Sequence, residues 1–144
     1  MITTLDLPSS LTFSPTADAY INESTPDTNY GSSPFLRVDA SPVLNSYLKF
    51  TVAGLFDRTI TRVRLLVYAN SSSSQVLHAL AVADNSWTEG TLTYNNAPLI
   101  GSLLGASTPA IGGTWMELDI TGSINSEGEF TFGVTTPGLF RLLG

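Results

Sequence analysis

The chain has 144 residues and a net charge of −6, and 42% of its residues are hydrophobic while only 12% are charged. This length and composition predict one globular domain, residues 1–144, that buries its own core. The acidic balance argues against nucleic-acid binding, because phosphate contacts need a basic surface. The absence of cysteine excludes disulfides, thiolate metal sites and a cysteine nucleophile.

The first ten residues, MITTLDLPSS, have neither the basic start nor the apolar core of a signal peptide. No apolar run approaches the roughly 20 residues of a membrane span, so we expect no membrane insertion. The sequence therefore predicts a mature or excised domain, or a protein, such as a virion protein, that leaves its cell without the secretory route.

Near the N-terminus, we expect strands around Leu11, over 17–22 and over 34–39, with a long polar loop from Asn22 to Ser33. The loop is rich in Asn, Asp, Ser and Thr, whose side chains can bond backbone amides that have no partner in a sheet. We interpret it as an ordered corner of a sandwich. A ligand- or calcium-binding loop is the alternative.

The rest of the chain alternates between apolar and polar residues, with strands expected over 47–52, 61–69, 74–82, 114–120 and 129–134 and short pieces near Leu92 and Leu103. Turn signals such as Gly112-Gly113 separate these segments. About ten short strands at this spacing predict an all-β protein, a single-domain antiparallel β-sandwich of the jelly-roll type. At most one helical turn is expected, within 121–128.

Five segments resemble the DNRLRE-domain family in order and spacing: FSPTADAYINESTPDTNYGSSPFLRV, YLKFTVAGL, ITRVRLLVYA, DNSWTEGTLTYNNAP and WMELDIT. That family is similar to the alginate-associated carbohydrate-binding modules. The resemblance covers about residues 12–135 and implies a jelly roll that binds glycans and is not an enzyme. The string that names the family is absent, and the chain ends in GLFRLLG where the family usually continues through another strand.

A missing last strand would leave an unpaired sheet edge. Either a short substitute strand or a neighbouring subunit could complete the sheet, and the apolar residues at this edge are Leu139, Phe140, Leu142 and Leu143. Oligomerisation would hide this apolar surface, so a homo-oligomer or a contact with other structural subunits is expected.

The segment ADNSWTEGTLTY places Asp84 and Glu89 on either side of Trp87, which resembles a sugar site with an acid pair. The family resemblance instead implies a structural corner, in which Trp87 fills the core, Glu89 binds backbone amides and NNAP makes a turn. We favour the structural interpretation. Three other aromatic residues are expected to be exposed: Tyr30, Tyr94 and Trp115.

Basic residues are few, and most of them lie on the polar sides of expected strands. If those strands pair, one face would gather Arg37, Tyr47, Lys49, Arg62, Arg64 and Tyr68. Such a face, with Trp115 as a stacking platform, could hold a uronate or a sulfate, because Arg makes bidentate contacts with oxyanions. Ordinary cross-strand pairing with Asp39, Glu117 or Asp119 is the alternative.

The single histidine, His78, leaves little equipment for acid–base catalysis, and neither a GxSxG nor an HExxH motif occurs. We therefore expect no enzyme and no required cofactor. A structural calcium ion is a further prediction, although no EF-hand spacing occurs, and its candidate ligands are Asp18, Glu23, Asp27 and Asp119.

Two functions follow from these features. We rank a structural or attachment protein of a virion, such as a phage decoration, neck or fibre protein, slightly ahead. The alternative is a monomeric glycan-binding module of a secreted polysaccharide-active protein. Both are non-catalytic, both allow a polysaccharide partner, and both predict an extracellular or virion location.

Overall fold

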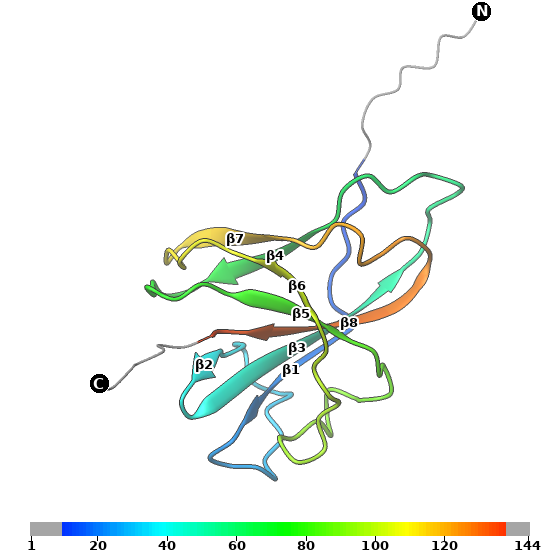
Figure 1. Ribbon diagram of the computed structural model, residues 1–144. Coiled ribbons are helices and arrows are strands. Elements are labelled where there is room, and N and C mark those ends of the chain that lie inside the picture. The colour runs from blue at the N-terminus through cyan, green and yellow to red at the C-terminus, as the bar shows by residue number, and fades with distance from the viewer. Residues whose placement is uncertain (1–9, 138–144) are drawn as a thin grey trace, which may run out of the picture.

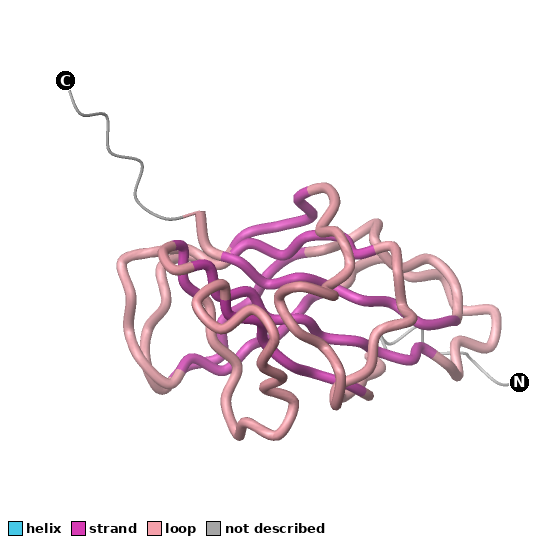
Figure 2. Tube along the Cα trace, turned by 90° about the horizontal axis from the view of Figure 1, so that it is seen from below, coloured by secondary structure: helices cyan, strands magenta, loops and turns pink. Residues whose placement is uncertain are grey.

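The computed structural model describes residues 10–137, and this part of the chain forms eight strands and no helix. The strands are β1 (Ala17–Asn22), β2 (Asp39–Ala40), β3 (Val43–Val52), β4 (Arg64–Ala69), β5 (His78–Val82), β6 (Leu103–Ala106), β7 (Thr114–Asp119) and β8 (Gly128–Thr135). Long loops connect them at both ends of the molecule (Figure 2). Among the described residues there is accordingly no apolar helix that could span a bilayer.

Two antiparallel sheets lie face to face as a sandwich (Figure 1). Sheet A has six strands in the order β1-β3-β8-β5-β6, with β2 also paired to β3, and sheet B consists of β4 and β7. The pairing is nested, because β5 pairs with β6, β4 with β7 and β3 with β8. A long antiparallel hairpin that rolls up gives this nesting, so the predicted jelly-roll sandwich is confirmed.

The main core lies between the two sheets. Sheet A contributes Leu48 and Phe132, and sheet B contributes Leu65 and Leu118, all of them buried. These residues belong to the apolar faces that the alternation in the sequence predicts. The inward side of each strand is therefore confirmed for β3, β4, β7 and β8.

A second core covers the outer face of sheet A. Segment 83–100 folds across that face and buries Trp87, whose indole N–H donates a hydrogen bond of 3.0 Å to the Thr131 hydroxyl. The Tyr47 ring meets the indole edge-to-face at 6.0 Å. The ammonium group of Lys49 lies 4.7 Å from the indole ring centre and donates to the Trp87 carbonyl at 2.6 Å. The structural interpretation of Trp87 is confirmed.

The polar loop after β1 holds segment 83–100 in place. The side-chain amide of Asn29 donates to the carbonyls of Glu89 and Leu92, at 2.9 and 2.8 Å. A Cβ atom on Gly31 would lie 1.9 Å from the Glu89 carbonyl oxygen, so this close approach requires glycine. The loop is an ordered corner that braces a second loop across the edge of β1.

Three short strands that the alternation predicts do not join a sheet. The residues near Leu11 and Leu92 are irregular, and of 34–39 only Asp39 enters a strand. Leu36 and Val38 nevertheless pack against the main core. The apolar residues of this segment therefore contribute to the core although most of the segment does not pair with a strand.

The helical turn predicted within 121–128 is also absent, and turns occupy this segment. Gly122 and Gly128 have φ values of +94° and +144°, which a right-handed helix does not permit.

Trp87→Ala should lower the free energy of unfolding by about 3–5 kcal/mol, because it empties a buried site and removes the hydrogen bond from the indole to Thr131 and the cation–π contact with Lys49. Urea unfolding followed by circular dichroism measures the loss. Leu99→Ala is the control, since Leu99 is 92% exposed in the same loop and should change stability by less than about 0.5 kcal/mol. A loss of only about 1 kcal/mol for Trp87→Ala would contradict its anchoring role.

Candidate functional site

The outer face of sheet B carries two exposed aromatic residues that are directly opposite each other. Tyr68 of β4 and Trp115 of β7 are cross-strand partners, and they are 47% and 66% exposed. Their rings meet edge-to-face, with centroids 5.4 Å apart. Leu66, two residues along β4 on the same face, is exposed as well. This arrangement offers a rigid apolar platform to a ligand with a flat apolar face.

Charged side chains surround this platform. Arg64 forms an ion pair with Glu117 of the neighbouring strand, and both side chains are about half exposed. The hydroxyl and the backbone N–H of Thr121 hold the pKa of Asp119 below its usual value, and the charge of Arg62 acts in the same direction. The face therefore presents guanidinium donors and carboxylate acceptors beside the two aromatic rings.

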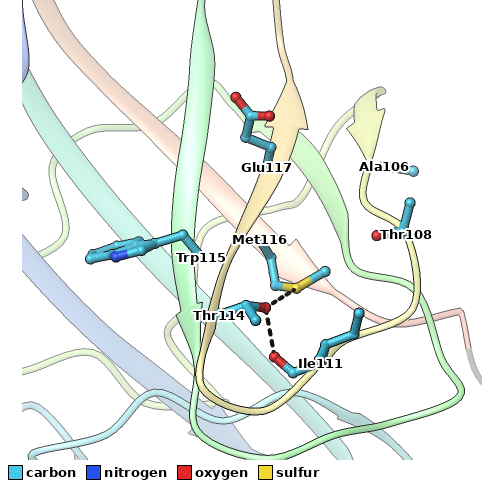
Figure 3. Close-up of a pocket in the computed structure, with 7 residues that line it drawn as sticks. All are labelled: Ala106, Thr108, Ile111, Thr114, Trp115, Met116 and Glu117. Carbon is cyan, nitrogen blue, oxygen red and sulfur yellow. Dashed lines mark hydrogen bonds between the residues drawn. The ribbon is translucent and has the colours of Figure 1, made fainter.

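Trp115 also borders two hollows. One, of about 460 Å³, is lined by Ala106, Thr108 and Ile111 on one side of β7, and Figure 3 shows Trp115 extending away from that side. The other, of about 770 Å³, lies between segment 10–15 and the start of β4. A ligand on the platform thus meets concave surface next to Trp115.

The predicted basic face does not form as one surface. Lys49 lies on β3 in sheet A, whereas Arg64 lies on β4 in sheet B, and these two strands do not pair. Arg62 stays close to Arg64, just before β4 begins. Arg37 lies in the segment before β2, with its guanidinium 6.0 Å from the centre of the Tyr20 ring. Strands that are neighbours in sequence belong to different sheets here, which separates the predicted set.

Tyr47 and Lys49 are not exposed in the way the sequence predicts. Tyr47 is 2% exposed, its hydroxyl donates to the Pro98 carbonyl at 3.0 Å, and burial raises its pKa to about 12. Lys49 is held against Trp87. The polar phase of β3 is correct, but segment 83–100 covers it, so the prediction that these two residues form a ligand face was wrong.

Of the three other aromatic residues that the sequence predicts to be exposed, two are exposed and one is not. Trp115 and Tyr94 are exposed as predicted. Tyr30 is half-buried, because its ring stacks on Tyr20 at 4.4 Å and its hydroxyl is hydrogen-bonded to Thr25. The polar-side positions of Tyr68 and Trp115 within their strands gave the usable signal for a binding platform.

The four predicted calcium ligands do not come together. Within residues 10–137, no group of three or more His, Cys, Asp or Glu side chains is placed to hold a metal ion. Glu23 accepts a hydrogen bond from the Val43 N–H at 3.1 Å, and Asp27 accepts one from the Asn95 side chain at 2.7 Å. Calcium binding stays a prediction, without a ligand set in the described part of the chain.

Asp18 and Glu89 form a close carboxyl pair at the edge of sheet A. The backbone N–H of Asp18 donates to a carboxylate oxygen of Glu89 at 2.9 Å, so Glu89 binds a backbone amide as the structural interpretation predicts. Burial raises the pKa of Asp18, and the neighbouring Glu89 carboxylate raises it further. His78 lies half-buried in β5, the strand in which the sequence places it.

The predicted assembly edge, Leu139, Phe140, Leu142 and Leu143, lies outside the described residues.

The family model of carbohydrate-binding module family 96 matches residues 9–139, a range that includes both sheets and the platform. No curated protein matches the chain. The family match agrees with the carbohydrate-binding part of the resemblance in the sequence and covers nearly the same residues, whereas the DNRLRE-domain name stays a resemblance.

Asp18→Asn should stabilise the protein at neutral pH. In the unfolded chain the Asp18 carboxyl has its ordinary pKa of 3.8, and in the folded protein its pKa is raised. Over a range of pH above 3.8, the folded state therefore keeps the Asp18 proton, whereas the unfolded chain has released it. Stability falls as pH rises through that range, and the loss persists at higher pH. The uncharged amide avoids this loss.

Urea unfolding of Asp18→Asn and the wild type at about pH 7 and about pH 3 tests this linkage. The gain should be present at the higher pH and absent at the lower one. Glu129→Gln, at an exposed site, is the matched control and should show no such difference. An equal effect of Asp18→Asn at both pH values would show that the carboxyl pair does not matter.

Proposed function

Because the chain belongs to carbohydrate-binding module family 96, we propose that it binds a polysaccharide on the outer face of sheet B. The family is one of binding modules and not of enzymes, which agrees with the expectation that the protein is not a catalyst. The platform of Tyr68 and Trp115 is the observation that carries the choice of face.

A sugar ring presents C–H groups from one of its faces, and these pack on an aromatic ring much as other apolar groups do. Exposed aromatic side chains on a rigid sheet lose little conformational entropy when a ligand binds. Sheet A has no comparable platform in the described residues, because the main core covers one of its faces and segment 83–100 covers the other.

The charges beside the platform favour an acidic glycan. Guanidinium groups make bidentate hydrogen bonds with the carboxylate of a uronate or with a sulfate, and Arg62 makes no ion pair within residues 10–137. Glu117 and Asp119 can accept hydrogen bonds from sugar hydroxyls. A mixed face of this kind supports binding of a charged, hydroxyl-rich polymer outside the cell or on a virion surface.

The assembly role in a virion, which the sequence analysis ranks first, becomes the second candidate. The family match supports the glycan-binding alternative directly and contains nothing that points to a decoration, neck or fibre protein. Oligomerisation through the C-terminal residues stays a prediction.

Trp115→Ala and Tyr68→Ala should each weaken polysaccharide binding about tenfold or more, because truncating a central aromatic contact commonly costs that much. Isothermal titration with alginate oligosaccharides, as acidic probes, and with neutral glucan oligosaccharides measures the loss. Phe35→Ala is the matched control, since Phe35 is an exposed aromatic residue far from this face in the chain. Equal weakening by Phe35→Ala, or none by Trp115→Ala, would rule out the proposed face.

Arg62→Ala should weaken binding of the acidic probe more than of the neutral one, and added salt should reduce this difference. Arg37→Ala removes an exposed arginine that lies outside the platform and should have no effect. Loss of binding in Arg37→Ala with none in Arg62→Ala would move the site to the loops near β2.

A further inference from the structure

A cleft opens between the sheets beside β4, at the free edge of sheet B. Sheet B has two strands and therefore covers only part of the inner face of sheet A. The hollow of about 770 Å³ lies where this cover ends, between segment 10–15, segment 58–64 and the inner residues of β3 and β8. Its size falls within the range of about 300–1,000 Å³ that is typical of small-molecule pockets.

The floor of the cleft is apolar and incompletely covered. Phe13, Phe50, Leu55, Ile60 and Val63 all line it and pack against the main core, yet each is only half-buried. Apolar side chains that belong to a core are normally surrounded by close-packed neighbours. Among residues 10–137, nothing closes the main core on this side to an apolar ligand.

The charged residues that line the cleft are all positive. They are Arg58, Arg62 and Arg64, and no described acidic residue joins them, although the chain as a whole has a net charge of −6. Arg64 is paired with Glu117, whereas Arg58 and Arg62 form no ion pair within residues 10–137. Both of these arginines are exposed at the mouth of the cleft.

We propose that this cleft binds a fatty acid, with the acyl chain along the apolar floor and the carboxylate held by Arg58 and Arg62. A polysaccharide would leave the apolar floor unfilled, and a neutral apolar ligand would gain nothing from the two arginines. A ligand with one apolar chain and one anionic head satisfies both features. This site adjoins the aromatic platform, because Leu66 and Trp115 border both, but its apolar floor lies between the sheets and Tyr68 does not line it.

Isothermal titration of the full chain with octanoate, decanoate and octanamide, all below their aggregation limits, tests the proposal. Decanoate should bind about 15-fold more tightly than octanoate, since it has two more methylenes and each buried methylene strengthens binding about fourfold. Octanoate should bind about tenfold more tightly than octanamide, because the amide lacks the charge that the arginines recognise. If neither octanoate nor decanoate binds, the proposal is overturned.

Variants locate the site. Arg58→Ala combined with Arg62→Ala should weaken decanoate binding about tenfold. Phe35→Ala, at an exposed residue that does not line the cleft, should leave it unchanged. Thr61→Trp places a bulky ring at an exposed position of the cleft and should abolish binding, whereas Thr51→Trp, at an exposed threonine outside the cleft, should not. Circular dichroism melting confirms that each variant is folded. Binding that resists both the arginine and the Thr61→Trp substitutions contradicts the assignment.

Discussion

The burial of Trp87 beneath its own loop determines which surfaces of this protein are free. A buried indole must have its N–H hydrogen-bonded, and the Thr131 hydroxyl of β8 provides the acceptor. Lys49 adds a cation–π contact to the ring and a hydrogen bond to the backbone carbonyl. These contacts fix segment 83–100 across the outer face of sheet A. The outer face of the larger sheet is therefore closed to a ligand.

The small size of sheet B shapes both proposed sites. Two strands expose one flat outer face, on which Tyr68 and Trp115 stand opposite each other. The same two strands are too narrow to close the main core, which leaves the arginine-lined cleft beside β4. Elsewhere the segment before β2 supplies the missing cover, because Tyr30 stacks on Tyr20 and Leu36 packs against the main core.

Period-two alternation in the sequence predicted most of the fold, since it depends only on local backbone geometry. It predicted most of the strands, the inward sides of β3, β4, β7 and β8, and the exposure of Trp115. It could not show that a distant loop covers Tyr47 and Lys49, because either face of a strand can be buried. Nor could it show that β3 and β4 enter different sheets, which separates Lys49 from Arg64. No local pattern in the sequence predicts the cleft, because the cleft exists only where the two-stranded sheet B is too narrow to cover sheet A.

The indole N–H resonances of the two tryptophans offer the most direct test of glycan binding on the outer face of sheet B. One belongs to buried Trp87 and the other to exposed Trp115, so a titration with an alginate oligosaccharide reports on both sheets at once. The account predicts a progressive shift of the Trp115 signal together with amides of β4 and β7, while the Trp87 signal stays in place. A shift confined to Trp87 and segment 83–100 would place the binding face on sheet A and contradict it.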